Sequence, residues 1–235
     1  TEAKAALGRF DTHTYSDRSS ENFAALKQTA VNSGKNFWMS EVDNGNLAGT
    51  NAKNMGAGLS LAVNILEDMN SMQPSAWVMW DILDKHKDAE FVAPNGTNSE
   101  ANTSNAQHIG TWGVGMVNHD TKEIELTQKY YVYGQFTKYI NPGDTIIASS
   151  PTTLAAYNKD TGAIKIVAVN TTGDTQNYRF DLSAFSQTGT SAKIIRTSGS
   201  FTDGEHWKDV GTAEVKDGKF RFDLPANSVT TFVID

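Results

Sequence analysis

Residues 36–42 read Asn-Phe-Trp-Met-Ser-Glu-Val, an apolar run that ends in a carboxylate at Glu41. A second apolar run, Ala-Trp-Val-Met-Trp-Asp-Ile, occupies residues 76–82 and follows the chain break that Pro74 predicts. Short, nearly continuous apolar runs of this kind are typical of strands in a parallel sheet that is covered on both faces. These two stretches therefore predict parallel strands, and they decide the fold class of the first half of the chain.

Helix-like segments separate the strand-like ones. Arg9–Tyr15 alternates like a short strand, and the segment after it has a helical start signal at Ser19 or Ser20 and a helical stop at Gly34. Helices are predicted over residues 20–32, 58–72 and 128–140. Repeated strand-then-helix units imply a parallel sheet covered by helices, so residues 1–142 are predicted to be an α/β domain.

Residues 143–235 have a different pattern. Short alternating runs, separated by turn signals such as Lys216-Asp217-Gly218, favour an antiparallel β-sandwich. The runs are 145–149, 153–157, 163–170, 177–181, 192–196, 213–215, 219–223 and 228–234. The predicted fold class is therefore α/β plus all-β, with the boundary near Pro142.

Composition excludes several function classes. The 235 residues carry 27 acidic and 20 basic side chains, a net charge of -7, which argues against nucleic acid as the main partner. No run of about 18 apolar residues is present, so no membrane span is predicted. The absence of Cys removes disulfides, thiolate nucleophiles and zinc–thiolate sites. Nucleotide-binding glycine motifs are also missing.

The first half is too short for a closed barrel. A (β/α)8 barrel needs eight strand–helix units in about 250 residues, and three strands leave roughly five units missing. Thr1–Leu7 resembles the end of a helix and has no signal-peptide pattern. We therefore expect the chain to begin inside a folded unit, with an N-terminal barrel portion or a second chain supplying the remainder.

Reactive side chains gather where the predicted strands end. Asp11, His13 and Tyr15 alternate along the first strand, Glu41 ends the second, and Trp80 ends the third. Functional side chains of α/β folds lie at the carboxyl ends of parallel strands. A carboxylate beside an aromatic platform suits carbohydrate chemistry, because the carboxylate stabilises or attacks an oxocarbenium-like centre and the ring stacks on a sugar. Trp38 and Trp77, in mid-strand, are predicted to be core residues.

Three stretches in order, FWMSEVDNG, AWVMWDI and QKYYVYGQFTKYINPGD, resemble glycoside hydrolase family 30 over nearly the whole chain. The resemblance implies the C-terminal part of a (β/α)8 TIM barrel with a side β-sandwich and retaining chemistry without cofactor or metal. It implies that Glu41 is the nucleophile after strand seven. His13 and Tyr15 then match active-site residues after strand six, and Trp80 matches a subsite aromatic after strand eight. The family's acid/base Glu lies in an Asn-Glu pair that this chain lacks.

Further substrate contacts are predicted near these strand ends. Asp43 and Asn44 directly follow the Glu41 strand, and Trp112 lies beside glycines in a loop. Family substrates include β-1,6-galactan, β-1,6-glucan, glucuronoxylan and glucosylceramide. The polar insertion after Asp81 and the stretch 110–113 look most similar to the endo-β-1,6-galactanase branch. An oligo- or polysaccharide is thus the expected substrate, at an extracellular or cell-surface location inferred from that function.

Two functions stay open on sequence alone. The first is a retaining glycoside hydrolase of which this chain is one part. The chain alone is expected to be inactive, because retaining hydrolysis needs two carboxyl groups. The second is a non-catalytic carbohydrate-binding or structural β-sandwich module, with a platform of Trp207 and Tyr157 or Tyr178. Glu41 could also be a rim ion-pair partner and His13 a structural histidine. The enzyme is favoured because it explains reactive residues at three separate strand ends.

Overall fold

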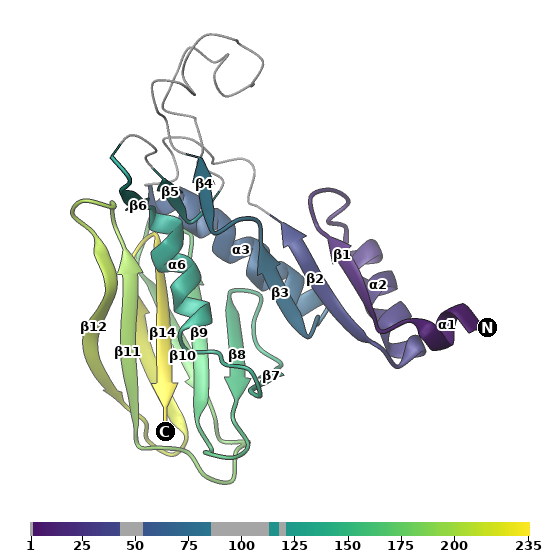
Figure 1. Ribbon diagram of the computed structural model, residues 1–235. Coiled ribbons are helices and arrows are strands. Elements are labelled where there is room, and N and C mark those ends of the chain that lie inside the picture. Colours follow the sequence, from purple (N-terminus) through teal and green to yellow (C-terminus); the bar gives the residue numbers. More distant parts are fainter. Residues whose placement is uncertain (1, 43–53, 86–112, 118–120) are drawn as a thin grey trace. The chain divides into compact units, whose positions relative to one another are not determined.

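A computed structural model of the chain describes residues 2–42, 54–85, 113–117 and 121–235 (Figure 1). Contacts between Cα atoms divide the chain into two compact units. Unit 1 is Thr1–Gly49 with Asn64–Glu125, and unit 2 is Thr50–Val63 with Leu126–Asp235. None of the described helices has the length and apolar character that a bilayer crossing needs.

Unit 1 is built on a three-stranded parallel sheet. Strands β1 (Arg9–His13), β2 (Asn36–Val42) and β3 (Ala76–Met79) pair in the order β1-β2-β3, so β2 is central (Figure 1). Helix α1 (Glu2–Ala6) precedes β1, α2 (Ser20–Ser33) connects β1 to β2, and α3 (Met55–Ser71) lies between β2 and β3 in the chain. The structure thus contains the parallel strands and intervening helices that the apolar runs predict.

Helix α2 shows why local sequence predicts its ends well. The Ser19 hydroxyl accepts a hydrogen bond from the Asn22 N–H at 3.2 Å, which satisfies one of the free donors of the first turn. At the other end Gly34 has φ 63°, a left-handed conformation that costs glycine little, and its N–H donates to the Ala30 carbonyl at 3.1 Å. Both capping predictions are confirmed.

The parallel sheet is covered on one face. Phe23 of α2 packs with Phe37, Met39 and Val42 of β2 and with Met72 in a buried apolar cluster. The opposite face bears exposed residues, including Asp11 and His13 of β1 and Val78 of β3. The apolar runs predicted burial on both faces, whereas the described part of the chain buries only the face under the helices.

Strand β3 is shorter than the predicted 76–82, because the chain leaves the sheet after Met79 and Ile82 is exposed. A small sheet that sequence patterns did not predict follows, formed by β4 (Leu83–Lys85), β5 (Gly115–Val117) and β6 (Ile124–Leu126) in the order β4-β5-β6. The polar insertion after Asp81, predicted to run from Asp84 to about Gln107, lies outside the described residues except for its first two positions.

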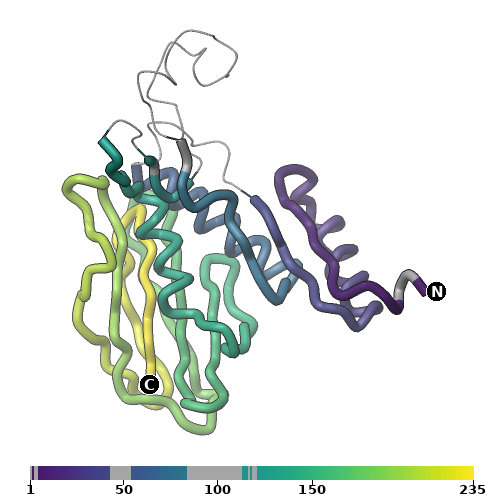
Figure 2. Tube along the Cα trace, viewed as in Figure 1, coloured from purple at the N-terminus to yellow at the C-terminus, as the bar shows by residue number. Residues whose placement is uncertain are grey.

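Unit 2 contains a six-stranded sheet in the order β12-β11-β14-β9-β8-β7 and a two-stranded sheet of β10 and β13. All its strand pairs are antiparallel. Figure 2 shows the C-terminal strand, in yellow, running inside the larger sheet. The strands are β7 (Thr145–Ile147), β8 (Thr153–Tyr157), β9 (Ile164–Asn170), β10 (Gln176–Asp181), β11 (Ser191–Ser198), β12 (Glu205–Glu214), β13 (Lys219–Leu224) and β14 (Ser228–Ile234).

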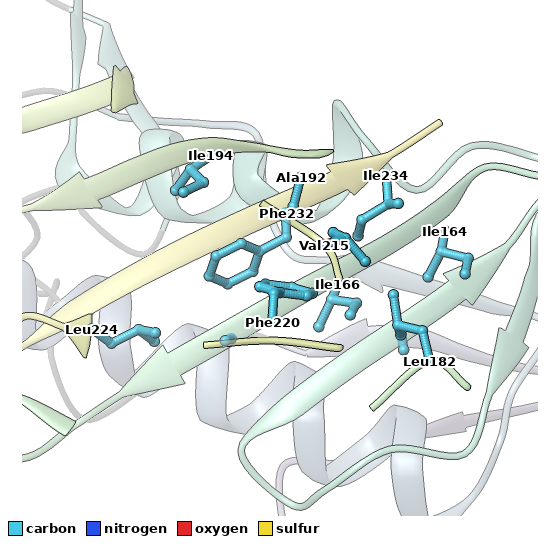
Figure 3. Packing of buried hydrophobic residues seen from close by; sticks show 12 residues of the cluster. Ile164, Ile166, Leu182, Ala192, Ile194, Val215, Phe220, Leu224, Phe232 and Ile234 are labelled. Carbon is cyan, nitrogen blue, oxygen red and sulfur yellow. The ribbon is translucent and has the colours of Figure 1, made fainter. Parts of the chain in front are cut away.

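The two antiparallel sheets share one apolar core. Phe220 of β13 and Phe232 of β14 lie with ring centroids 5.3 Å apart, in one buried cluster with Ile166 and Ile194 of the larger sheet and Leu224 of the smaller one (Figure 3). Alternate residues of each strand supply this core, as the alternating sequence pattern predicts.

Helix α6 (Gln128–Thr137) packs against the six-stranded sheet. The Thr231 hydroxyl donates to the Gln135 carbonyl at 3.0 Å, and the Gln135 amide donates to the Thr197 hydroxyl at 2.8 Å. The Trp207 indole N–H donates to the Tyr131 carbonyl at 2.6 Å. Contacts group α6 with unit 2, and a domain boundary near Pro142 stays a prediction.

Candidate active site at the strand ends

Glu41 lies at the carboxyl end of the central strand β2, with 38% of its side chain exposed. Its neighbour across the parallel pairing is His13, the last residue of β1, and the register shifts between Thr12 and His13. The carboxyl ends of parallel strands meet at one edge of the sheet, and this shared edge is why two residues far apart in the chain come together there.

The structure brings Tyr15, His13 and Glu41 together. The Tyr15 hydroxyl donates a hydrogen bond of 2.9 Å to Oε1 of Glu41. Nδ1 of His13 lies 3.8 Å from the same oxygen, and the His13 and Tyr15 rings meet edge to face with centroids 6.0 Å apart. One carboxylate oxygen is therefore held by neighbours, while the side chain remains open to solvent.

Trp80 follows β3 at the same edge. Its backbone N–H donates to the carbonyl of Val42 at 3.0 Å, which ties it to the residue after Glu41. The side chain is 44% exposed, and the peptide bond to Asp81 is cis. The backbone of Trp80 is thus fixed beside the end of β2, with an indole ring accessible to a ligand.

The remaining sequence predictions have mixed outcomes. Asp43, Asn44 and Trp112 lie outside the described residues, so their substrate contacts stay predictions. Asp11, on the same face as His13, is paired with Arg9 at 2.7 Å. The Arg9 guanidinium in turn lies 3.8 Å from the ring centre of Trp38. Trp38 is half-buried in this stack and is not a full core residue as predicted.

Sequence reasoning missed Asp68, a fully buried carboxylate in α3. It accepts hydrogen bonds from the Thr14 hydroxyl at 3.0 Å and the Trp77 indole at 2.8 Å. Burial raises the pKa of Asp68, although the hydrogen bond from Trp77 and the charge of Arg18 oppose that rise. Trp77, predicted to be core, is half-buried and serves as a donor. Nothing in the sequence marks Asp68, because Thr14 lies 54 residues away in the chain and Trp77 reads only as part of an apolar run.

The site residues described so far suit the stabilisation of positive charge. Within the described ranges, no three His, Cys, Asp or Glu side chains group closely enough to hold a metal ion. Glu41 can act as a nucleophile or stabilise positive charge, Tyr15 and His13 can orient it, and Trp80 can stack on a sugar ring.

The aromatic residues proposed as a platform on the second unit are engaged in packing. Trp207 lies against Gly134 of α6 with the Lys138 ammonium 3.8 Å above its ring. Tyr178 and Tyr157 pack against the shared core of the two sheets. The exposed large hydrophobic side chains of the described residues all precede residue 126: Tyr15, Val31, Val78, Trp80, Ile82, Leu83 and Ile124.

Comparison with solved structures shows which known fold the chain is similar to. No family model matches the chain. A family 30 endoxylanase from Clostridium papyrosolvens superimposes with a TM-score of 0.68 at 22% identity, covering 98% of this chain and 50% of that one. A family 30 subfamily 8 xylanase from Clostridium acetobutylicum gives a TM-score of 0.66 at 25% identity, covering 97% of this chain and 49% of that one. The fold is therefore that of part of a glycoside hydrolase.

Sequence comparison adds one curated relative. An endo-β-1,6-galactanase from Hypocrea rufa is 24% identical over 229 residues, which cover 96% of this chain and 40% of that protein. The two solved structures carry the name of glycoside hydrolase family 30, the family that the motifs of this chain resemble. The chain spans half or less of the length of each of these relatives.

Proposed function

We propose that this chain is the nucleophile-bearing part of a retaining glycoside hydrolase, consisting of the last three β/α units of a (β/α)8 barrel and a side β-sandwich. The observation that carries the proposal is the hydrogen bond from Tyr15 to Glu41 at the open edge of a parallel sheet. Such an edge is where barrel enzymes hold their active sites. The sheet face bearing Asp11, His13 and Val78 would then line the barrel interior.

Glu41 performs the first step of the proposed reaction. One carboxylate oxygen forms a bond to the anomeric carbon while the glycosidic C–O bond breaks, giving a covalent glycosyl-enzyme intermediate. The leaving oxygen takes a proton from a second carboxyl group. Water then attacks the anomeric carbon, gives its proton to that same group and releases Glu41. Since Tyr15 donates to Oε1, the other oxygen of Glu41 is the one best placed to attack.

The second carboxyl group belongs to the missing part of the barrel. In a retaining enzyme the two carboxyl groups are about 5–5.5 Å apart. Asp11, the exposed carboxylate nearest along β1, is already paired with Arg9. We therefore assign the acid/base role to an N-terminal barrel portion or a second chain, and no metal or cofactor to the reaction.

The substrate we propose is a β-linked glycan, with β-1,6-galactan as the first choice because the fungal relative is named for it. Trp80 would stack on a sugar, and Asp43, Asn44 and Trp112 would contact neighbouring units. A polymer-degrading enzyme of this kind would work outside the cell or at its surface. The alternative of a binding module has less support, since Trp207, Tyr157 and Tyr178 are packed against other parts of unit 2.

The test uses the complete enzyme, identified by intact mass and by an inventory of every polypeptide in the active preparation. Sugar release from β-1,6-galactan and xylan is measured for the wild type and for Glu41→Gln, and the anomeric form of the first product is read by NMR. We expect galactan cleavage with retained configuration, lost in Glu41→Gln. Inverted product, or an active Glu41→Gln enzyme, overturns the proposal.

A further inference from the structure

The buried carboxylate of Asp68 joins three segments of unit 1. Its Oδ2 accepts from Thr14, which follows β1, at 3.0 Å and from Trp77 of β3 at 2.8 Å. Its Oδ1 lies 3.0 Å from the Arg18 guanidinium. Burying a carboxylate costs free energy unless it is paired and hydrogen-bonded. These partners therefore stabilise Asp68, and Asp68 in turn fixes their positions.

Arg18 extends this connection to the whole turn after β1. It donates to the Thr14 carbonyl at 3.1 Å and to the Asn64 carbonyl of α3 at 3.4 Å. It also pairs with Glu67 at 2.9 Å, but that side chain is 51% exposed, whereas that of Asp68 is fully buried. The buried Asp68 is therefore the main side chain of α3 that holds the turn from Thr14 to Arg18.

Asp68 contacts chain segments that lie on both sides of Glu41, the candidate nucleophile. Strand β2, which carries Glu41, lies between β1 and β3. Thr14 directly precedes Tyr15, the residue that donates to Glu41, and Trp77 lies three residues before Trp80. One carboxylate thus anchors the chain segments that deliver Tyr15 and Trp80 to the two flanks of Glu41.

We propose that Asp68 is a positioning residue that holds Thr14 and Trp77, and through them keeps the Tyr15 hydroxyl on Glu41. This role rests on the proposed glycosidase function. Partners behind a site fix the orientation of the groups that touch the substrate, and a loosely supported site loses rate although all its reactive groups are present. Asp68 touches no reacting atom and acts only through its neighbours.

The kinetic test compares Asp68→Asn with Glu67→Gln in the complete enzyme. Each variant removes one negative charge next to Arg18, but only the first changes the group that holds Thr14 and Trp77. We expect Asp68→Asn to lower kcat by roughly 10- to 100-fold, a size typical of lost supporting contacts, with a much smaller change in KM. Glu67→Gln should keep kcat within about 2-fold, in line with an exposed ion pair.

A second pair of variants separates positioning from general loss of structure. Thr14→Val keeps the side-chain shape but removes the hydroxyl that donates to Asp68, whereas Thr14→Ser retains it. We expect Thr14→Val to reduce kcat in the same direction as Asp68→Asn and Thr14→Ser to restore it, at matched thermal stability. Equal kcat in all of these variants and the wild type overturns the proposal.

NMR of the 235-residue chain gives a readout that does not need activity. In the wild type the Trp77 indole N–H should exchange slowly with solvent, and Asp68→Asn should speed this exchange and shift the Tyr15 ring signals, while Glu67→Gln leaves both unchanged. Unmoved Tyr15 signals in Asp68→Asn overturn the positioning role. Shifted signals together with an inactive wild-type enzyme support the positioning of Tyr15 but contradict the glycosidase function.

Discussion

At the scale of single residues, the candidate site depends on one hydrogen bond between two half-exposed side chains. Tyr15 lies beyond the end of β1, yet its hydroxyl reaches Glu41 on the neighbouring strand. A donor on one oxygen of a carboxylate fixes its rotamer and leaves the second oxygen for attack. The pair therefore explains how Glu41, the proposed nucleophile, stays oriented at an edge that is open to water.

Replacing Tyr15 by Phe tests this pair. A hydrogen bond to a charged group contributes about 1.5–3 kcal/mol, which corresponds to roughly 10- to 150-fold in rate. We expect Tyr15→Phe to reduce kcat of the complete enzyme within that range while the thermal midpoint is unchanged, because the ring is half-exposed. Wild-type kcat in Tyr15→Phe would show that the bond has no part in the reaction.

Sequence alone could place Glu41, His13 and Tyr15 together, because residues at the carboxyl ends of neighbouring parallel strands share an edge. It could not find Asp68. That residue lies in a helix whose apolar stripe is the visible signal, and Thr14, its hydrogen-bonding partner, is 54 residues away in the chain. Long-range pairing of a buried polar group leaves no local pattern.

At the scale of elements, helix caps and the alternation of apolar residues predicted the bounds of several helices and strands. β2, β8 and β14 have the predicted bounds, whereas β12 begins at Glu205 and not at residue 213. Trp207 explains part of that error: its φ of 51° interrupts regular strand geometry where it turns onto α6. The strands β4 to β6 have three residues each, too few for a recognisable period.

The contact between α6 and Trp207 predicts a large effect at Gly134. A Cβ atom there would overlap the indole ring of Trp207, whereas Gly56 of α3 has no neighbour within 4 Å. We expect Gly134→Ala to destabilise unit 2 by about 1–3 kcal/mol, as overpacking does. The matched variant Gly56→Ala should change stability by less than about 1 kcal/mol. Urea unfolding measures both, and equal effects would contradict the packing described here.

The stability contributed by the contact between strands β11 and β12 depends on pH. Arg196 of β11 holds Glu205 of β12 through two hydrogen bonds, and together with the hydrogen bonds from Lys208 and Ser198 it lowers the pKa of Glu205 from 4.5 to about 2. A lowered carboxyl pKa adds stability that is complete above the unfolded pKa and is lost as the pH falls through the folded one. The contribution of Glu205 should therefore disappear between about pH 4.5 and about pH 2.

Glu205→Gln checks this window. The loss of stability in the variant should be largest near pH 7, on the order of 1.5–3 kcal/mol for hydrogen bonds to a charged group, and should shrink as acid protonates the wild-type carboxyl. Urea unfolding of both proteins at about pH 7 and about pH 3 gives the comparison. A difference that stays constant across this range would exclude ionised Glu205 as its source.

At the scale of the whole molecule, the two sheets of unit 2 share one buried core, whereas the described residues of unit 1 bury one face of its parallel sheet. Exposed large hydrophobic side chains are confined to unit 1 among the described residues. Contiguous exposed apolar surface marks sites where something binds. The prediction of an incomplete barrel, which rests on the count of three strand–helix units, stays a prediction.

The 235-residue chain alone is expected not to hydrolyse glycosides, because the proposed mechanism assigns it only one of the two carboxyl groups that the reaction needs. Reducing-sugar release by the purified chain, with Glu41→Gln as the control, measures this. Steady turnover that disappears in Glu41→Gln would mean that a second carboxyl group within residues 1–235 serves as acid/base.

The assignment of Glu41 as nucleophile is tested most directly by covalent trapping in the complete enzyme. A 2-deoxy-2-fluoro-β-galactosyl reagent with a dinitrophenolate leaving group needs no proton from the acid/base, and its fluorine slows release of the intermediate. Peptide mass analysis should then find one glycosyl group on the peptide that contains Glu41, and none in Glu41→Gln. A label on any other carboxylate of the enzyme would contradict the account.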